Sequence, residues 1–375
     1  MLSTQLHSFQ IEKRSQGIVD ALHQRIDPRV PPTQDSNMYR SMSLIEIARE
    51  FFDMHGENTR GMSRFEVAGH ALQSRAGGMM GAADFPSLLA NVASKRLRSL
   101  YDENPGTYTI WARRAPDAMD FKAINTVQMS GAPQLLQTNE HGEFKYGYMR
   151  DSGETYALLT YGRIVSLTRQ AMVNDDLRGF DRLIQSFASS ARRLENRLAY
   201  AQLTANANLS DGVALFDATT HKNLQTGGGS ALQLSSLAAG RAAMRVQKGL
   251  IDEELNLAPA YLIVPAALEQ TAYQLTSPNY VPTRPADVNE FRTAGRTALT
   301  PVVEPLLDAV SATGWYLACD SSQVDTVEYC YLNGSDGPVV DSQPDFSRDG
   351  VSFRCRLDFA AKAVDYRGLY CSAGT

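Results

Sequence analysis

A long amphipathic helix that follows a strand constrains this chain more than any other feature. The apolar and β-branched residues of Tyr161–Arg169 predict the strand. The turn after it contains Asn174, Asp175 and Asp176, typical helix N-caps, so we predict a helix over about 176–203. One side of this helix is apolar at helical spacing, with Phe180, Leu183, Ile184, Phe187, Ala191, Leu194, Leu198 and Ala201. Such a helix needs a partner surface along its whole length.

The opposite side of the helix is predicted to carry charge. Its residues are Glu195 and five arginines, Arg178, Arg182, Arg192, Arg193 and Arg197. Arginines in such a row bind phosphate groups or form ion pairs within or between subunits. The net charge of −5 gives no reason to expect a broad basic surface for nucleic acid. We therefore interpret the arginines as ion-pairing residues, and contact with DNA stays open.

The composition is that of a folded protein with one large domain or two to three ordinary ones. Of the 375 residues, 43% are hydrophobic and 21% are charged. No apolar run approaches the ~18 residues that cross a bilayer, and the N-terminus lacks the apolar core of a signal peptide. We expect a protein made and assembled in the cytosol, with no membrane partner.

The four cysteines predict neither a zinc site nor disulfides. No two of them have C-x-x-C spacing, and three lie in apolar runs typical of strands. We expect reduced thiols, and burial at the first three of Cys319, Cys330, Cys355 and Cys371.

The N-terminal residues 1–83 predict a helical arm with too few large apolar residues for a core of its own. A helix over Ile11–Ile26 should stop before Pro28. Two capping-box spacings, Ser43 with Glu46 and Ser63 with Glu66, each predict a further short helix. The arm should therefore pack against other parts of its own subunit or of a neighbour.

A glycine joint at Gly77, Gly78 and Gly81 separates the arm from the next helix. Asp84 and Pro86 are typical of a helix start, and this helix should run to about Tyr101. Residues 107–150 then mix aromatic and β-branched residues with glycines and polar groups, which predicts a two-stranded excursion. Such a ribbon usually needs a partner surface.

Helices and then strands are predicted after the long helix. The loop at 277–297 contains three prolines and has no periodicity. The predicted elements are a helix from Ser235 or Ser236 to Gly249, a strand at Tyr261–Val264, a helix from Pro265 to about Leu275, and strands at Thr300–Pro305, Gly314–Cys319, Thr326–Leu332, Val339–Ser342 and Val351–Phe359.

The sequence contains no recognisable catalytic, metal or cofactor motif. Its six histidines are scattered, and no G-x-S-x-G turn or phosphate-binding loop is present. The segment from Asp345 to Gly350 mimics the start of a calcium loop, but Arg356 stands where the liganding Glu should be. We therefore expect a protein that is not an enzyme and binds no cofactor.

Several specific strings resemble one protein family. They are SLTRQAMVNDDL at 166–177, LSDGVALF at 209–216, YLIVP at 261–265, GWYL at 314–317, RLDF at 356–359 and DYRGLY at 365–370. The chain resembles the major capsid proteins of tailed bacteriophages and prophages. The most similar branch is often fused to a ClpP-like prohead protease and has Mu-like major head subunits among its relatives.

The resemblance implies an α+β chain with the Hong Kong 97-type (HK97-like) capsid fold. The implied parts are an N-terminal arm (1–83), an N-terminal helix with the entry to an extended loop (84–118), the two-stranded extended loop itself (119–151), a peripheral domain (152–250 and 336–375) with the long spine helix, and an axial domain (251–335). In this family the extended loop lies across a neighbouring subunit.

The resemblance also implies the partners of the chain. Hexamers and pentamers of the chain itself would form an icosahedral shell around packaged double-stranded DNA, assembled in the host bacterial cytoplasm. A portal, scaffold or maturation protease would take part, and the protease would be a separate chain. The expected inter-subunit residues are Phe121, Lys122, His141, Phe144, Lys145, Tyr146, Arg178, Arg182, Arg192, Arg193 and Arg197.

Some related capsid proteins undergo cleavage or covalent crosslinking. Cleavage at the Gly77–Gly81 joint would remove the arm. Crosslinking through Lys122 or Lys145 is not expected, because no partner constellation accompanies them. Two other functions remain as alternatives: an encapsulin-like shell that encloses cargo enzymes, and a soluble α+β enzyme or binding module. The second predicts a monomer or small oligomer.

Overall fold

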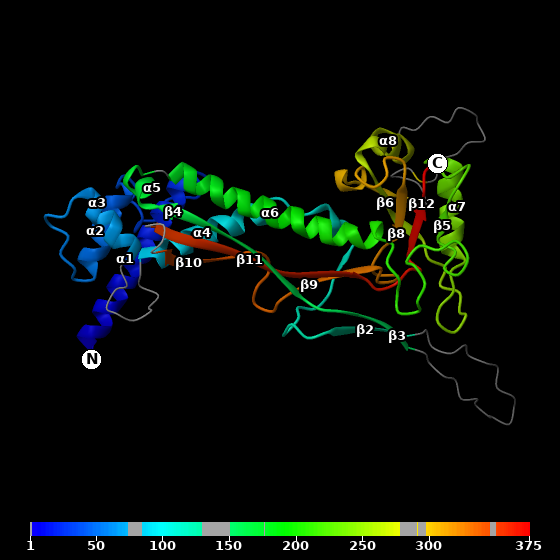
Figure 1. Cartoon of the computed structure of the whole chain (residues 1–375), viewed down its shortest axis with the longest axis horizontal. Coiled ribbons are helices and arrows are strands. Elements are labelled where there is room, and N and C mark those ends of the chain that lie inside the picture. The colour runs from blue at the N-terminus through cyan, green and yellow to red at the C-terminus, as the bar shows by residue number, and fades with distance from the viewer. Residues whose placement is uncertain are drawn as a thin grey trace, which may run out of the picture. The chain divides into compact units, whose positions relative to one another are not determined.

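The chain forms two compact units, and segments of both alternate along the sequence. The computed structural model describes residues 2–73, 85–129, 151–175, 177–277, 291, 298–345 and 350–375 (Figure 1). Unit 1 comprises 1–105, 160–193 and 334–358, and unit 2 comprises 106–159, 194–333 and 359–375. Helix α6 (Leu177–Thr204) and strand β11 (Gly350–Ala363) contribute residues to both units.

Unit 1 begins with three helices, α1 (Leu2–Ile26), α2 (Leu44–Met54) and α3 (Arg64–Gln73). The predicted end of α1 at Ile26 is confirmed, but its predicted start at Ile11 is wrong. Residues 2–10 contain neither proline nor glycine, so nothing in them ends the helix. Both predicted capping boxes are confirmed. The backbone N–H groups of Ser43 and Ser63 each donate to the Glu three residues later at 2.7 Å.

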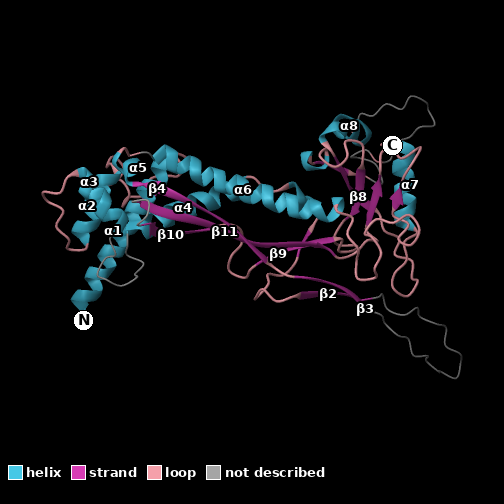
Figure 2. Ribbon diagram, viewed as in Figure 1, coloured by secondary structure: helices cyan, strands magenta, loops and turns pink. Residues whose placement is uncertain are grey.

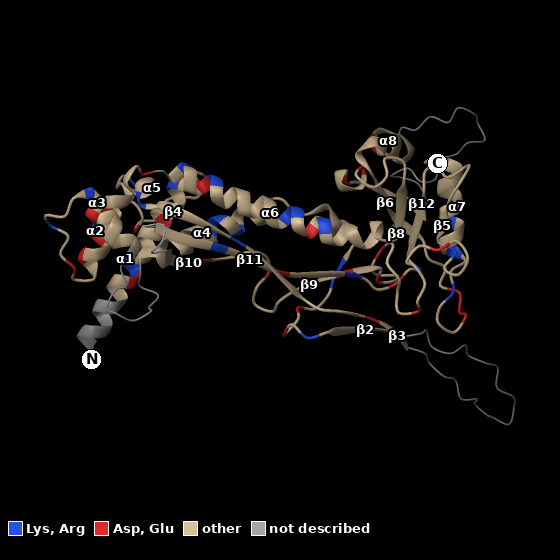
Figure 3. Ribbon diagram, in the orientation of Figure 1, with Lys and Arg blue, Asp and Glu red and all other residues tan. Residues whose placement is uncertain are grey.

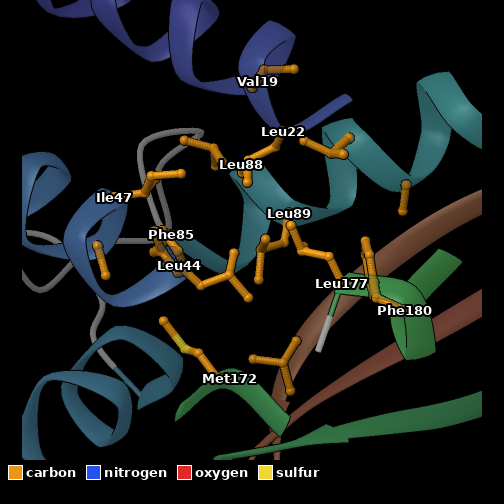
Figure 4. Close-up of a cluster of buried hydrophobic side chains, with 14 of the residues drawn as sticks. Val19, Leu22, Leu44, Ile47, Phe85, Leu88, Leu89, Met172, Leu177 and Phe180 are labelled. Carbon is orange, nitrogen blue, oxygen red and sulfur yellow. The ribbon is translucent and has the colours of Figure 1, made fainter. Parts of the chain in front are cut away.

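The helical arm packs into the core of unit 1. Helix α4 (Phe85–Glu103) and the first half of α6 share this core with α1–α3. Figure 4 shows the apolar side chains that meet there, among them Val19, Leu22, Leu44, Ile47, Phe85, Leu88, Leu89, Met172, Leu177 and Phe180. Strands β10 (Val339–Asp345) and β11 complete the core. The arm thus depends on the rest of its own subunit, one of the two predicted possibilities.

The junction before α6 differs from the predicted polar turn. Strand β4 (Leu159–Thr168) is followed by a one-turn helix, α5 (Arg169–Val173), so Arg169 begins a helix instead of ending the strand. Thr168 is the N-cap of α5 and Asn174 its C-cap. Asp175 has a left-handed φ of +54°, and Asp176, the predicted cap directly before α6, lies outside the described residues. Helix α6 itself lies within one residue of the prediction.

Unit 2 contains a five-stranded sheet in the order β5-β12-β8-β6-β7. The strands β6 (Pro259–Val264), β7 (Thr300–Val303) and β8 (Trp315–Cys319) were predicted, whereas β5 (Leu224–Gln225) and β12 (Leu369–Ser372) were not. The two short strands carry few residues, so their sequence pattern is weak. Buried side chains such as Trp315, Leu317 and Leu262 form the core of this sheet.

Helices α7 (Leu234–Arg245) and α8 (Glu269–Thr276) pack beside this sheet, α7 near β12 and α8 near β6 and β7 (Figure 2). The predicted end of α7 at Gly249 is wrong, and its N-cap is Gln233 instead of a serine. Ser236 acts at the third position of the helix, where its hydroxyl accepts the N–H of Gln233 at 3.0 Å. The predicted helix at 265–275 is a short 3₁₀ turn (Ala266–Leu268) followed by α8. Further 3₁₀ turns lie at Thr107–Ile110 and Pro305–Leu307.

Strand β11 pairs with different strands in the two units. Within unit 1 it pairs antiparallel with β10, and β4 also pairs with it. Within unit 2 its last residues pair antiparallel with β9 (Val327–Tyr331), which also pairs with the two-residue β1 (Arg113–Arg114). The observed mixture of helices and strands confirms the predicted α+β class. No helix in the described ranges combines the length and apolar character of a membrane span.

The predicted excursion begins and ends as a two-stranded antiparallel ribbon of unit 2. Strands β2 (Ile124–Met129) and β3 (Asp151–Tyr156) pair from Ile124 opposite Tyr156 to Met129 opposite Asp151. Residues 130–150 lie outside the described part of the chain. The side chains of Ile124 and Tyr156 pack on a small apolar cluster with Leu158, Cys330 and Ala360. We call β2 and β3 the ribbon.

Candidate functional site

Three of the predicted arginines lie on one exposed face of α6 within unit 1. Arg178, Arg182 and Arg193 are exposed, and the exposed Ser186 and Ser189 lie between them on the same helical face. None of the three arginines has a hydrogen bond or ion pair to another residue in the described ranges. Figure 3 shows the basic positions along α6. We call Arg178, Arg182 and Arg193 the arginine row; its positive charges have no acidic partner among the described residues.

The other two predicted arginines of α6 differ from each other. Arg197, in the unit 2 part of the helix, is exposed and also makes no hydrogen bond or ion pair within the described residues. Arg192 is half-buried in unit 1, and its guanidinium group donates to the backbone carbonyl of Tyr101 through Nε at 3.1 Å and Nη2 at 2.7 Å. Arg192 is therefore engaged inside its own unit.

The prediction that Glu195 lies on the charged face is wrong. Its side chain is fully buried in unit 2 and accepts hydrogen bonds from the hydroxyls of Tyr108 at 3.1 Å and Tyr331 at 3.3 Å. The predicted apolar stripe also shifts near the end of α6. Ala199, Tyr200 and Leu203 are the buried residues there, while Leu194, Leu198 and Ala201 are only half-buried.

The remaining predicted contact residues belong to the extended loop. Phe121 and Lys122 are exposed, and Lys122 Nζ lies 3.3 Å from the carboxylate of Asp120. His141, Phe144, Lys145 and Tyr146 lie outside the described residues.

Two apolar residues near the ribbon were missed by sequence reasoning. The exposed fractions of Met119 and Val127 are 82% and 62%, and that of Phe121 is 50%. Val127 lies on the outer face of β2, whereas Ile124 and Thr126 point inward. The alternation of side chains along a strand was the signal that could have identified Val127. These exposed apolar side chains suit a surface that a partner covers.

A buried ion-pair cluster that the sequence did not reveal fixes α6 in unit 1. Arg96 on α4 is almost fully buried and bonds both Asp27, just after α1, and Asp181 on α6. The side chain of Arg29 also bonds Asp27, and together with Arg96 it lowers the pKa of Asp27 to about 2. This carboxylate is therefore charged at any ordinary pH.

Asp175 makes a second link between the arm and α6. Its carboxylate accepts the backbone N–H of Leu44, the first residue of α2, at 2.9 Å. It also forms an ion pair of 2.7 Å with Arg25 on α1. A carboxylate at a helix N-terminus is stabilised by the free N–H groups and the helix dipole. Asp175 thus stabilises α2 rather than α6.

Potential metal ligands do not gather in the part of the chain that the structure describes. The described residues hold no cluster of three or more His, Cys, Asp or Glu side chains that could bind a metal ion. All four cysteines are free thiols, and burial raises the pKa of each of them, to about 12 for Cys319 and Cys371. What the chain offers instead is a set of surfaces: the arginine row, the ribbon and its exposed apolar residues.

A family model described as phage capsid protein matches residues 153–372, more than half of the chain. The chain belongs to the phage capsid protein family. Its place is the capsid of a phage virion, and its described residues have an α+β architecture. No curated protein matches the sequence significantly.

Solved structures with a similar arrangement include phage and encapsulin chains. A chain from Mycobacterium phage Adephagia is 13% identical, with a TM-score of 0.45 over 72% of this chain and 90% of its own. The capsid of Myoviridae phage XM1 is 9% identical, with a TM-score of 0.46 over 71% and 89%. The holo-SrpI encapsulin complex from Synechococcus elongatus is 10% identical, with a TM-score of 0.40 over 71% and 86%. The family assignment itself rests on the sequence match.

Proposed function

We propose that copies of this capsid protein form hexamers and pentamers that close into an icosahedral shell around the double-stranded DNA of a tailed phage. Assembly would take place in the host cytoplasm, with a portal, a scaffold or a maturation protease as partners. The chain would perform no catalysis. The family match over 153–372 carries this proposal, because it includes α6 and continues to the last strand.

We infer that different segments of the chain form the different parts of a capsid subunit. Residues 1–83 serve as the arm, 84–118 as the N-terminal helix, and 119–151 as the extended loop. Residues 152–250 and 336–375 serve as the peripheral domain and 251–335 as the axial domain around five- and six-fold axes. The two compact units draw their boundaries differently, because they divide α6 after Arg193.

We further propose that the arginine row, together with Arg197, contacts neighbouring subunits. Its guanidinium groups have no acidic partner in the described residues, whereas Arg192 is already bonded to Tyr101. Carboxylates of an adjacent subunit would pair with the row, and DNA phosphates are the second possible partner. Phe121, Lys122, His141, Phe144, Lys145 and Tyr146 would contact the neighbour through the extended loop. This assignment agrees with the exposure of Phe121 and Lys122.

Size-exclusion chromatography with negative-stain microscopy of the full-length protein tests the shell. We expect hexamers, pentamers or megadalton particles, and a stable monomer that never assembles would contradict the proposal. Nuclease-protected double-stranded DNA in purified particles supports the phage capsid. Enclosed protein cargo without DNA would instead favour an encapsulin-like compartment.

Neutralising the arginine row separates its two possible partners. The triple variant Arg178→Gln, Arg182→Gln, Arg193→Gln should assemble poorly if the row binds other subunits. If the row binds DNA, the variant should assemble normally but package less DNA. Arg98→Gln is the matched control, because Arg98 is an exposed arginine that already pairs with Asp102 on α4. Normal assembly and packaging by the triple variant would exclude both roles.

A further inference from the structure

The segment after α6 folds into a small hairpin that touches the ribbon. Residues 206–216 form this hairpin, with a β-bridge between Asn208 and Ala214 and a backbone hydrogen bond of 2.9 Å from Leu209 N–H to the Val213 carbonyl. The Asn206 side chain closes its base by bonding both backbone groups of Phe216. We call residues 206–216 the clamp hairpin. It lies entirely in unit 2, as does the ribbon.

One side of the clamp hairpin holds Glu154 in β3. The backbone N–H of Ser210 donates to Glu154 Oε1 at 2.5 Å, and Lys362 Nζ on β11 lies 3.5 Å from Glu154 Oε2. The Glu154 side chain is only 8% exposed. A carboxylate is costly to bury unless it is paired and hydrogen-bonded, so these two contacts account for its position. Glu154 also faces Thr126, its partner on β2, whose hydroxyl donates to the Glu154 carbonyl at 2.9 Å.

The other side of the clamp hairpin is fixed to His221. His221 Nε2 lies 2.8 Å from Asp211 Oδ2, and Nδ1 lies 3.2 Å from the Leu215 carbonyl oxygen. The imidazole is almost fully buried and stacks on the Tyr366 ring, with centroids 3.6 Å apart. The backbone carbonyl of His221 accepts a hydrogen bond of 2.8 Å from Gln247. His221 is thus held rigidly and can anchor the hairpin.

We propose that the clamp hairpin sets the direction in which the ribbon projects from the rest of unit 2. The connected contacts run from Tyr366 and His221 through Asp211 and Ser210 to Glu154. An isolated two-stranded ribbon is marginally stable in water, so its base must be held by other elements. The inward side chains of the ribbon supply an apolar contact, and the clamp hairpin supplies a directional polar one. The role of this direction in reaching a neighbouring subunit rests on the proposed function.

Hydrogen exchange of the full-length, unassembled subunit tests the clamp without requiring assembly. In Glu154→Ala the backbone amides of β2 and β3 should exchange about tenfold faster, because a buried charged hydrogen bond is lost. Asp211→Ala should produce a similar acceleration in the ribbon, because the Asp211 carboxylate fixes the clamp hairpin to His221. Thr155→Ala is the matched control, since the Thr155 side chain lies on the exposed face of β3 and its hydroxyl donates to Asn125 within the ribbon itself.

The exchange pattern decides the proposal. Faster exchange in the ribbon for Glu154→Ala and Asp211→Ala, with β6 and β8 unchanged and Thr155→Ala close to the parent protein, supports the clamp. Unchanged ribbon exchange in Asp211→Ala, or an equal effect of Thr155→Ala, overturns it. If Glu154→Ala also loses protection in β6 and β8, it has unfolded unit 2, and Asp211→Ala alone decides. An assembly failure of the parent protein would contradict the capsid function and leave this result valid.

Discussion

The central carbon of the Arg192 guanidinium group lies over the Tyr101 ring, 3.3 Å from its centroid. The same group donates two hydrogen bonds to the Tyr101 carbonyl oxygen. Tyr101 lies in the last turn of α4, where backbone carbonyls have no partner inside the helix. Arg192 therefore caps the last turn of α4 and also contacts the Tyr101 ring. These two interactions explain why its side chain is half-buried.

Arg192→Ala should lower the free energy of unfolding of the subunit by about 1–3 kcal/mol, because it removes charged hydrogen bonds and the cation–π contact. Urea unfolding of the unassembled protein measures this change. Arg182→Ala, on the same helix but exposed and unpaired in the described residues, should change stability by less than about 0.5 kcal/mol. Equal effects of the two substitutions would contradict the capping role.

Asp27 should make the stability of the subunit depend on acid pH. Its pKa falls from 3.8 to about 2 in the folded chain, chiefly through the hydrogen bonds from Arg29 and with help from Arg96. The folded state therefore gains about 2 kcal/mol from this carboxylate above pH 4. That gain should fall as the pH drops from about 4 towards 2, where the carboxylate is protonated in both states.

Asp27→Asn isolates this contribution. At pH 7 the variant should be less stable than the parent by about 2–3 kcal/mol, since Arg96 stays buried with Asp181 as its remaining carboxylate partner in the cluster. Urea unfolding at a series of pH values should show the difference shrinking near pH 2.5. A difference that stays constant across this range would mean that the Asp27 carboxylate is not the titrating group.

The cysteines should be inert in the folded protein. Burial raises the pKa of Cys355 to about 11 and that of Cys319 and Cys371 to about 12, so almost no thiolate exists at pH 8. A chromogenic disulfide reagent should therefore react slowly with the native subunit. After denaturation it should react with all four thiols. Rapid labelling of the native chain would show that the strands bearing these cysteines open readily.

The extended loops are expected to remain uncrosslinked. The Lys122 side chain is 87% exposed, and its ammonium group lies 3.3 Å from the carboxylate of Asp120. Purified particles boiled in denaturant and run on a gel should give only the monomer band. A ladder of higher bands that persists after reduction would show covalent bonds between subunits, and Lys122→Arg would then identify whether this lysine forms them.

Local sequence patterns predicted the starts of α2 and α3 well, although they misplaced the start of α1 and the end of α7. Each capping box needs only a serine and a glutamate three residues apart, so the structure realises both where the sequence places them. The exposed arginines of α6 were also predicted by helical periodicity alone. Such features depend on neighbours within one or two turns, which a single sequence contains in full.

Contacts between residues distant in the sequence could not be predicted in this way. Periodicity placed Glu195 on the polar face, but its partners Tyr108 and Tyr331 are 87 and 136 residues away and bring their hydroxyls into the core. Asp175 resembled a cap for the following helix, yet it bonds the start of α2, 131 residues earlier. The clamp hairpin contacts Glu154 across 56 residues. No local pattern identifies which distant residue satisfies a buried polar group.

The alternation of the two units along the chain has a consequence for synthesis on the ribosome. The core of unit 1 contains Ile18 and Leu22 near the start of the chain and Val351 and Phe353 near its end. Part of the apolar surface of the first helices therefore stays uncovered until almost the whole polypeptide has been translated. During that interval the helices expose aggregation-prone apolar surface to the cell. A nascent chain of this kind is a natural client for chaperones, and a truncated one should aggregate.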